Sequence, residues 1–209
     1  MRRDIKLIAF DLEGVLTDGA GCWREIHRAL GTLKKAEIHH QLFRQGKISF
    51  DRWALSDAKL WKGTSIEKIK QVMDNIMTIR GMPHTISRLK QKYKLAIISG
   101  GLDMLANRIK DRYGFDYAYA NEIITEDGKF ISVRTKVGFE DKGRILKEIL
   151  DAEDIRPENC AAVGDYINDI SMFKHAGFSI AFDPKDERIL EYADEVIFEK
   201  NLSLLLKYL

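Results

Sequence analysis

The chain has 209 residues, of which 45% are hydrophobic and 32% are charged, and its formal net charge is +2. This length suits one medium domain, or a core domain with a smaller inserted one. The near-neutral charge argues against nucleic acid or an acidic membrane as a partner. No apolar stretch approaches the roughly 20 residues of a membrane span, and none is long enough for the apolar region of a signal peptide. We therefore expect a cytoplasmic protein.

The first predicted element is a strand that runs from Ile5 to Phe10. An apolar run of this kind is typical of a strand covered on both faces of a sheet. Asp11 and Glu13 follow it directly, and Gly14 allows a sharp turn. Ligands of open α/β sheets bind beyond the carboxyl ends of the strands, so Asp11 would face that crevice, although many such aspartates only cap a helix.

Residues 23–77 show helical periodicity and no convincing buried strand, which predicts a small helical insertion. Trp53 and Trp61 are expected in its core. His39 and His40 are expected on a helix surface, because adjacent residues of a helix point in different directions and make a poor ligand pair. Cys22 and Cys160 lie far apart in the sequence and fit no metal-binding spacing, so we expect free thiols.

Strands and helices alternate from Pro83 onward. The predicted strands cover residues 95–98, 117–120, 123–125, 130–133, 160–163, 178–181 and 196–198, and the predicted helices cover 85–93, 102–113, 142–152, 167–175 and 202–208. Glu-Asp-Gly-Lys at 126–129 predicts a hairpin. The pattern indicates the α/β class, with a Rossmann-like parallel sheet flanked by helices and a small helical cap domain inserted after the first strand. Residues 1–17 and 78–209 would form the core domain with the catalytic site, and residues 18–77 the cap domain.

Three of the predicted strands end in polar groups, which are Asp11 with Glu13, Ser99 to Gly101, and Asp165 with Asn168 and Asp169 just beyond. If these strands are parallel neighbours, the groups meet in one crevice. Crowded carboxylates repel one another, and Mg²⁺ would relieve that repulsion. Ser99 and the glycine N–H groups would form an anion cradle, with Lys136 or Lys142 as a balancing charge. This combination indicates phosphoryl transfer through an aspartyl phosphate.

The motifs resemble those of the haloacid dehalogenase superfamily of phosphatases, and within it the phosphoserine phosphatase branch. The resemblance rests on Asp-Leu-Glu-Gly-Val-Leu-Thr at 11–17, Ile-Ile-Ser-Gly-Gly at 97–101 and Val-Gly-Asp-Tyr-Ile-Asn-Asp-Ile-Ser-Met-Phe at 163–173. It implies a Mg²⁺-dependent hydrolase that removes phosphate from a small phosphorylated metabolite through a covalent intermediate on Asp11. The helical insertion would be the cap that closes over the site and sets specificity.

The resemblance also implies a role for each polar residue. The catalytic residues would be Asp11 as nucleophile, Glu13 as general acid and base, Ser99 and Lys142. The metal would be held by Asp11, the Glu13 carbonyl and Asp165, with Asp169 orienting a metal-bound water. The substrate would be held by Ser99, Gly100, Asn168, Arg44 and Phe50. Lys142 is preferred to Lys136 because the family's lysine opens the helix before the strand that carries the acidic pair.

Several positions depart from the family pattern. Glu13 stands where the family usually has Asp, and Ala20 stands where phosphoserine phosphatases place a Glu for the substrate amine. On the cap, Asp57 takes the place of the Arg that would hold the substrate carboxylate, and Arg44 takes that of an apolar residue. The resemblance therefore predicts a substrate other than phosphoserine, since a buried acid would repel a carboxylate. Asp18 and Glu25 could supply an amine contact by another route.

Three alternatives stay open at this point. The chain could be a phosphoserine phosphatase proper, a phosphotransferase with the same intermediate, or a non-catalytic relative that binds a ligand. A small-molecule phosphomonoester is the expected partner, with neither nucleic acid nor membrane involved. Whether the protein is a monomer or a homodimer is not decided by its sequence.

Overall fold

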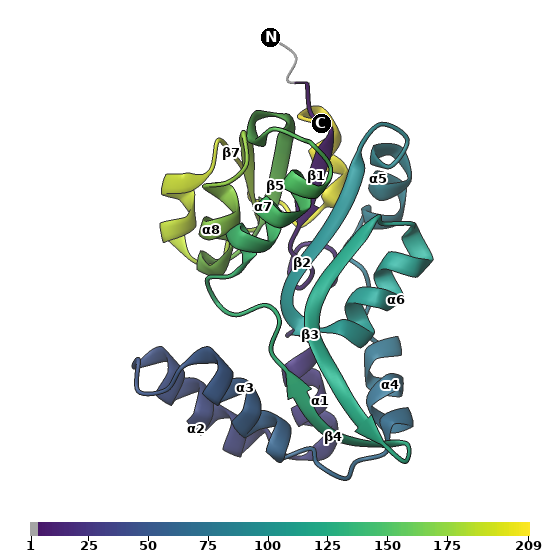
Figure 1. Ribbon diagram of the computed structural model, residues 1–209, viewed down its shortest axis with the longest axis vertical. Coiled ribbons are helices and arrows are strands. Elements are labelled where there is room, and N and C mark those ends of the chain that lie inside the picture. Colours follow the sequence, from purple (N-terminus) through teal and green to yellow (C-terminus); the bar gives the residue numbers. More distant parts are fainter. Residues whose placement is uncertain (1–3) are drawn as a thin grey trace.

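A computed structural model describes residues 4–209, so the first three residues of the predicted core domain lie outside the described residues. The fold is built on a seven-stranded sheet with the order β4-β3-β2-β1-β5-β6-β7 (Figure 1). The strands are β1 (Leu7–Phe10), β2 (Lys94–Leu102), β3 (Tyr117–Glu126), β4 (Lys129–Arg134), β5 (Cys160–Gly164), β6 (Phe178–Phe182) and β7 (Glu195–Ile197). Every neighbouring pair is parallel except β3 and β4, which confirms the predicted mostly parallel sheet.

Helices cover both faces of the sheet. The α-helices are α1 (Cys22–Leu30), α2 (Leu33–Arg44), α3 (Phe50–Lys59), α4 (Ile66–Asp74), α5 (Met82–Leu89), α6 (Asp103–Tyr113), α7 (Lys142–Ala152) and α8 (Ile170–Phe173). Short 3₁₀ segments complete the set: η1 (Pro157–Asn159), η2 (Ile167–Asp169), η3 (Glu187–Tyr192) and η4 (Leu202–Lys207). Among the helices of residues 4–209, none combines the length and the apolar character needed to cross a membrane.

The alternating side chains of β1 separate two hydrophobic cores. Leu7 and Ala9 pack with residues of α7 and α8 on one face, whereas Ile8 and Phe10 pack with residues of α5 and α6 on the other. All four side chains are fully buried, as expected for a central parallel strand. The structure therefore confirms the predicted strand that is buried on both faces.

The position of β1 between β2 and β5 brings the three motifs together. Phe10 is in register with Ile97 of β2 and with Val163 of β5. The residues that follow these three positions therefore emerge at the same edge of the sheet, where ligands bind in folds of this type. The residues that separate the motifs in the sequence form the crossover connections.

The helices α1 to α4 lie between β1 and α5 in the chain and beyond the carboxyl ends of the central strands (Figure 1). The predicted hairpin joins β3 to β4, and it reaches past the rest of the sheet to this helical insertion. There the Gly63 N–H donates to the Phe130 carbonyl, and the rings of Trp61 and Phe130 lie 5.5 Å apart. The long hairpin thus supports the insertion from the side of the sheet.

Two expectations for the insertion need correction. Trp61 is fully buried as expected, but Trp53 is only partly buried and lines a pocket. His39 is not a plain surface residue, because its Nδ1 lies 2.6 Å from Oδ1 of the buried Asp57. Both differences arise from packing between α2 and α3, which helical periodicity does not specify.

Candidate active site

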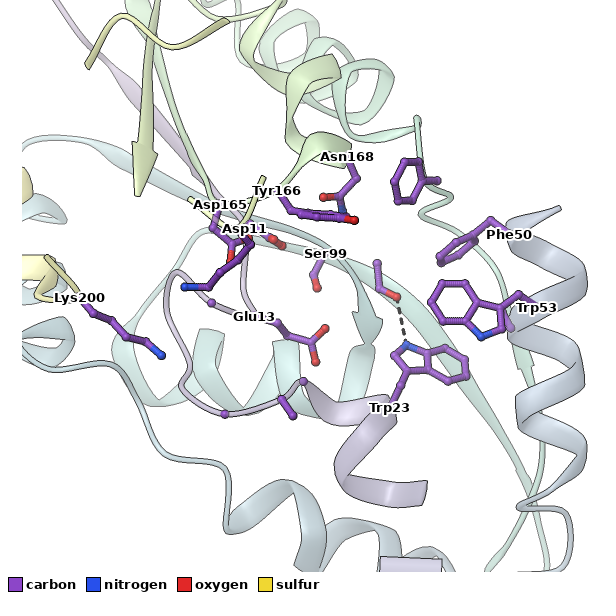
Figure 2. A pocket seen from close by; sticks show the side chains of 18 residues that line it. Asp11, Glu13, Trp23, Phe50, Trp53, Ser99, Asp165, Tyr166, Asn168 and Lys200 are labelled. Carbon is purple, nitrogen blue, oxygen red and sulfur yellow. Dashed lines mark hydrogen bonds between the residues drawn. The ribbon is translucent and has the colours of Figure 1, made fainter. Parts of the chain in front are cut away.

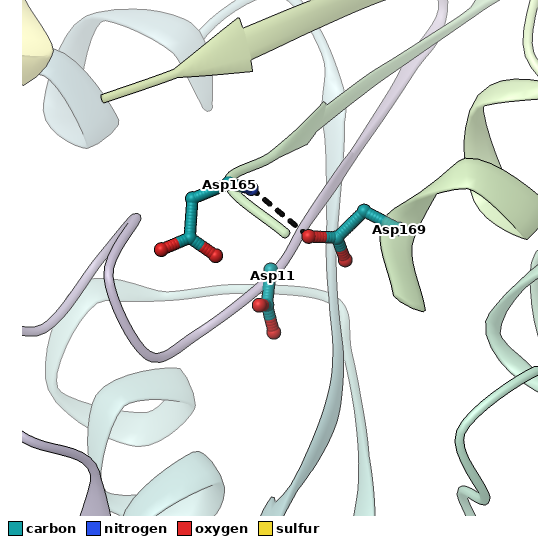
Figure 3. A group of neighbouring side chains, drawn as sticks. All are labelled: Asp11, Asp165 and Asp169. Atoms are coloured by element: carbon teal, nitrogen blue, oxygen red, sulfur yellow. Dashed lines mark hydrogen bonds between the residues drawn. The ribbon is translucent and has the colours of Figure 1, made fainter. Parts of the chain in front are cut away.

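Three buried aspartates form an acidic cluster at the carboxyl edge of the sheet (Figure 3). Asp11 follows β1, Asp165 follows β5, and Asp169 ends the 3₁₀ segment η2. One carboxylate oxygen from each lies within 4.8 Å of the others. A cluster of hard oxygen donors with this spacing fits a divalent cation such as Mg²⁺.

Lys142, the first residue of α7, places its ammonium group within this cluster. Its Nζ lies 2.8 Å from Asp11 Oδ1 and 2.5 Å from Asp169 Oδ1, and its side chain is fully buried. The alternative Lys136 is an exposed residue whose Nζ pairs with Glu122 at 2.9 Å. Of the two lysines considered from the sequence, the structure brings Lys142 to the aspartates.

The cluster holds more negative charge than Lys142 can balance. Burial, together with repulsion from Asp169, raises the pKa of Asp11 to about 7 despite the opposing effect of Lys142. Burial, Asp11 and Asp169 raise the pKa of Asp165 well above its ordinary value. Burial by itself would lower the pKa of Lys142, but Asp11 and Asp169 hold it above its ordinary value. A bound cation would favour the ionised carboxylates.

Asp169 differs from the other two aspartates because both of its oxygens accept hydrogen bonds. Oδ2 accepts the backbone N–H groups of Asp165 at 2.9 Å and Tyr166 at 3.1 Å, and Oδ1 accepts from Lys142. Gly164 leaves room for this side chain, since a Cβ on Gly164 would lie 2.4 Å from Asp169 Cβ. Asp169 therefore fixes the loop after β5, while Asp11 and Asp165 line the adjoining pocket.

Ser99 and Gly100 lie near the end of β2 on the same pocket. The Ser99 hydroxyl accepts the Gly101 N–H at 2.9 Å. The Gly100 carbonyl accepts Nε1–H of Trp23 at 3.2 Å and Nδ2–H of Asn121 at 2.9 Å. Sequence reasoning missed Trp23 and Asn121, although the position of Trp23 at the start of the first helix after the Asp11 motif was a usable signal.

Glu13 also lines the pocket, but its carboxyl group lies outside the acidic cluster. Its Oε1 accepts the backbone N–H of Cys22 at the start of α1. Two glycines make room for the extra methylene: a Cβ on Gly101 would lie 3.0 Å from Glu13 Oε2, and one on Gly21 would lie 3.4 Å from Oε1. The first turn of α1 thus anchors the side chain of Glu13, which stands where the family usually has Asp.

The pocket has a volume of about 350 Å³, within the range of small-ligand sites (Figure 2). Phe50 of α3 reaches over the Ser99–Gly100 segment, since a Cβ on Gly100 would lie 3.7 Å from the end of the Phe50 ring. Asn168 lines the pocket with a buried Oδ1 that has no hydrogen-bond partner among the described residues. Phe50 and Asn168 therefore both line the pocket, and their contact with a substrate stays a prediction.

The structure does not place Arg44 and Asp57 as the sequence predicted. Within the described chain, neither residue lines this pocket, and Arg44 is exposed at the end of α2. Asp57 is buried, with Oδ2 3.3 Å from His27 Nε2 and Oδ1 2.6 Å from His39 Nδ1. Asp57 thus pairs with histidines of the helical insertion, and it lines an adjoining cavity that shares Glu13, Ala20 and Trp53 with this pocket.

The other residues named as departures are also placed by the structure. Ala20 lines the pocket. Asp18 pairs with Lys200, and Glu25 pairs with Arg28 on α1. Both acids already have cationic partners, and neither is among the described residues that line this pocket. The alternative contact to a substrate amine is thus not preformed.

Comparison with known proteins decides the family. Residues 5–177 match the family model described as haloacid dehalogenase-like hydrolase. The chain belongs to this family. A protein of Methanocaldococcus jannaschii named phosphoserine phosphatase is 38% identical over all of both chains, which confirms the predicted branch and the enzyme class of phosphatases.

Solved structures agree with this assignment. The chain resembles a structure described as a phospho-aspartyl intermediate analogue of phosphoserine phosphatase, with a TM-score of 0.87, 37% identity, and coverage of 98% of this chain and 99% of the other. A substrate-bound phosphoserine phosphatase complex gives a TM-score of 0.87 with 36% identity and 98% coverage of both chains. A haloacid dehalogenase family hydrolase from Salmonella enterica serovar Typhi gives 0.90 with 30% identity, covering 97% of this chain and 70% of the other.

Proposed function

We propose that this protein is a Mg²⁺-dependent phosphomonoester hydrolase that acts on a small phosphorylated metabolite through an aspartyl phosphate on Asp11. The observation that carries the proposal is the convergence of Asp11, Asp165, Ser99 and Lys142 from four separate segments on one site. The likeness to a phospho-aspartyl intermediate analogue supports the same chemistry.

Asp11 is the proposed nucleophile. Its Oδ1 accepts hydrogen bonds from the Leu12 N–H at 2.7 Å and from Lys142 at 2.8 Å, which leaves Oδ2 to attack phosphorus. Lys142 stabilises the ionised form of Asp11, and only that form can attack. The buried ammonium thus orients the nucleophile and favours its charged form.

The metal would be held by the side chains of Asp11 and Asp165 and by the Glu13 backbone carbonyl, with Asp169 fixing the loop beneath them. When bound, Mg²⁺ would offset the negative charge of the carboxylates and the phosphoryl oxygens. Ser99, the Gly100 N–H and Asn168 would hold the remaining phosphoryl oxygens by hydrogen bonds.

Glu13 is the proposed general acid and base. It gives its proton to the leaving oxygen as the bond between that oxygen and phosphorus breaks, which releases the alcohol and leaves the phosphoryl group on Asp11. In the second step the Glu13 carboxylate takes a proton from water as the water oxygen attacks phosphorus. Free phosphate leaves, and the Asp11 carboxylate and the protonated Glu13 are restored.

The helical insertion, residues 18–77, is the proposed cap that selects the substrate. Phosphoserine is one candidate substrate, because similar proteins are named phosphoserine phosphatase. Two features argue against it: Ala20 offers no contact to a substrate amine, and the described residues that line the pocket include no arginine for a substrate carboxylate. Transfer of phosphate to an alcohol uses the same intermediate and is the second candidate. The cytoplasmic location stays a prediction.

The test is phosphate release from a panel of phosphorylated metabolites, with and without Mg²⁺. We expect Mg²⁺-dependent release, abolished by EDTA and by Asp11→Asn. Added alcohols that yield phosphorylated products beside free phosphate would reveal transfer. Absence of turnover of any substrate by the intact protein, including a generic aryl phosphate, would contradict the proposal and favour a binding role.

A further inference from the structure

Five aromatic side chains line one side of the pocket, and we call them the aromatic wall. They are Trp23, Phe50, Trp53, Phe139 and Tyr166. Trp23 belongs to α1 and Phe50 and Trp53 to α3, whereas Phe139 and Tyr166 lie in the loops after β4 and β5. Each of the five is only partly buried. Large aromatic rings left uncovered around a cavity are available to a ligand.

Four rings of the aromatic wall are linked across the helical insertion and the core, whereas Trp23 packs against Trp61. Phe50 and Trp53 meet edge to face with centroids 5.7 Å apart, and Phe139 and Tyr166 meet in the same way at 6.5 Å. Phe43 joins the two pairs, because its ring lies 4.9 Å from Trp53 and 5.3 Å from Phe139. Phe43 therefore supports the wall, and the shape of the wall depends on how the insertion is placed relative to the core.

The aromatic wall begins at the phosphoryl cradle. Phe50 lies above Gly100, and Trp23 donates its indole N–H to the Gly100 carbonyl. In Figure 2, Phe50, Trp53 and Trp23 lie on one side of Ser99. The alcohol part of a phosphate ester held at Ser99 and Asp11 would therefore lie against these rings.

Fixed charges of the pocket lie elsewhere. The acidic groups belong to the catalytic residues, and the two lysines that line the pocket are Lys185 and Lys200. Both already have acidic partners, Asp183 and Asp18. Figure 2 shows Lys200 on the opposite side of Ser99 from Phe50 and Trp53. The wall thus offers apolar ring surface and no fixed charge to match the two charges of an amino-acid zwitterion.

We propose that the preferred substrate is a phosphate monoester of an alcohol that carries an aromatic ring, which packs against the aromatic wall; this inference rests on the proposed phosphatase function. Offset-stacked and edge-to-face contacts favour an aromatic ring over an aliphatic group of similar area. Because Phe139 and Tyr166 belong to the core, such a ring would also hold the insertion against the core during the reaction.

The experiment compares kcat/KM for 2-phenylethyl phosphate, ethyl phosphate and O-phospho-L-serine. All three are alkyl esters, so the comparison avoids the high intrinsic reactivity of aryl phosphates. We expect 2-phenylethyl phosphate to exceed ethyl phosphate by at least about tenfold, the usual discrimination of an apolar pocket. Trp53→Leu and Phe139→Leu should each reduce this ratio, and a ratio measured within one preparation is unaffected by its fraction of active protein. Phe198→Leu is the control, because Phe198 is 73% exposed and does not line the pocket.

The outcomes separate the two proposals. Turnover of all three esters with equal kcat/KM, or preference for phosphoserine, would overturn the aromatic substrate while the hydrolase stands. Preference for phosphocholine over 2-phenylethyl phosphate would also overturn it, since aromatic rings can enclose a quaternary ammonium group instead. If no ester is hydrolysed, the hydrolase is overturned, and tryptophan fluorescence of the intact protein tests the aromatic wall by itself. Binding of 2-phenylethyl phosphate but not of ethyl phosphate would support recognition of an aromatic ring there, and binding of neither would overturn both proposals.

Discussion

Glu13 and Gly101 lie so close together that a methyl group on the Gly101 α-carbon would be 3.0 Å from Glu13 Oε2. The two residues come from β2 and from the turn after β1, and neither requires the other by sequence. Their contact explains how a glutamate fits at a position where the family usually has the shorter aspartate. The glycine thereby becomes a partner of the proposed acid and base.

Gly101→Ala should lower kcat by roughly tenfold to a hundredfold, because a displacement of a catalytic group by about an ångström has an effect of this size. Its backbone is not in the left-handed region, so alanine introduces no backbone strain. The double variant Gly101→Ala/Glu13→Asp should recover part of the loss, since the shorter acid no longer meets the methyl group. Additive losses in the double variant would show that the contact is unimportant.

Lys142→Met should abolish most activity and lower the free energy of unfolding by roughly 3–5 kcal/mol, the usual cost of removing one partner from a buried ion pair. Asp11 and Asp169 would then face each other without the intervening ammonium group. Lys136→Met is the matched control: its side chain is about half exposed and pairs at the surface, so the change should stay within about 0.5 kcal/mol. Urea unfolding and phosphate release measure the two effects, and similar losses in both variants would contradict the assignment.

The metal-free protein should lose stability as the pH rises from about 4 to 7. The pKa of Asp11 is about 7 in the folded protein against 3.8 as the ordinary value, so between these values the folded state binds more protons than the unfolded state. The raised pKa of Asp165 acts in the same direction. Thermal unfolding in EDTA across this pH range measures how the unfolding temperature changes with pH. An increase in the unfolding temperature with pH that is due to these two groups would contradict the prediction.

Saturating Mg²⁺ should raise the unfolding temperature at pH 8 by on the order of 5–10 °C, which corresponds to a ligand at about a hundred times its dissociation constant. The cation stabilises the ionised aspartates that destabilise the metal-free protein. Asp165→Asn should reduce the response to Mg²⁺, because it removes one ligand and one of the repelling charges. An equal shift in the variant would place the bound cation elsewhere.

Asp57→Ala should destabilise the protein by roughly 1–3 kcal/mol without changing the ratio of kcat/KM between phosphoserine and other esters. The change removes the hydrogen-bond partner of His39 and the carboxylate beside His27, but it alters no residue that lines the pocket. Asp51→Ala, at an exposed position of the same helix, should have a smaller effect. A gain of phosphoserine turnover in either Asp57→Ala or Asp57→Arg would show that residue 57 faces the substrate after all.

The α/β class, the buried first strand and the polar ends of the three motif strands could be predicted from the sequence, because each depends on a short local stretch. An apolar strand followed by Asp11 or by Gly164 and Asp165 carries its own signal. Parallel pairing then brings such ends to one edge, whatever lies between them. The start of the helix at Lys142 could likewise be predicted from the local pattern.

Which side chains point into the site depends on contacts between distant segments, and these were visible only in the folded chain. The contact of Glu13 with Gly101, the hydrogen bond from Trp23 to the Gly100 carbonyl and the pairing of Asp57 with histidines each join elements distant in the chain. Helical periodicity separates a buried face from an exposed one, but it does not say which neighbour that face meets. Packing between the helical insertion and the core therefore fixes the aromatic wall and leaves Arg44 and Asp57 outside the lining of this pocket.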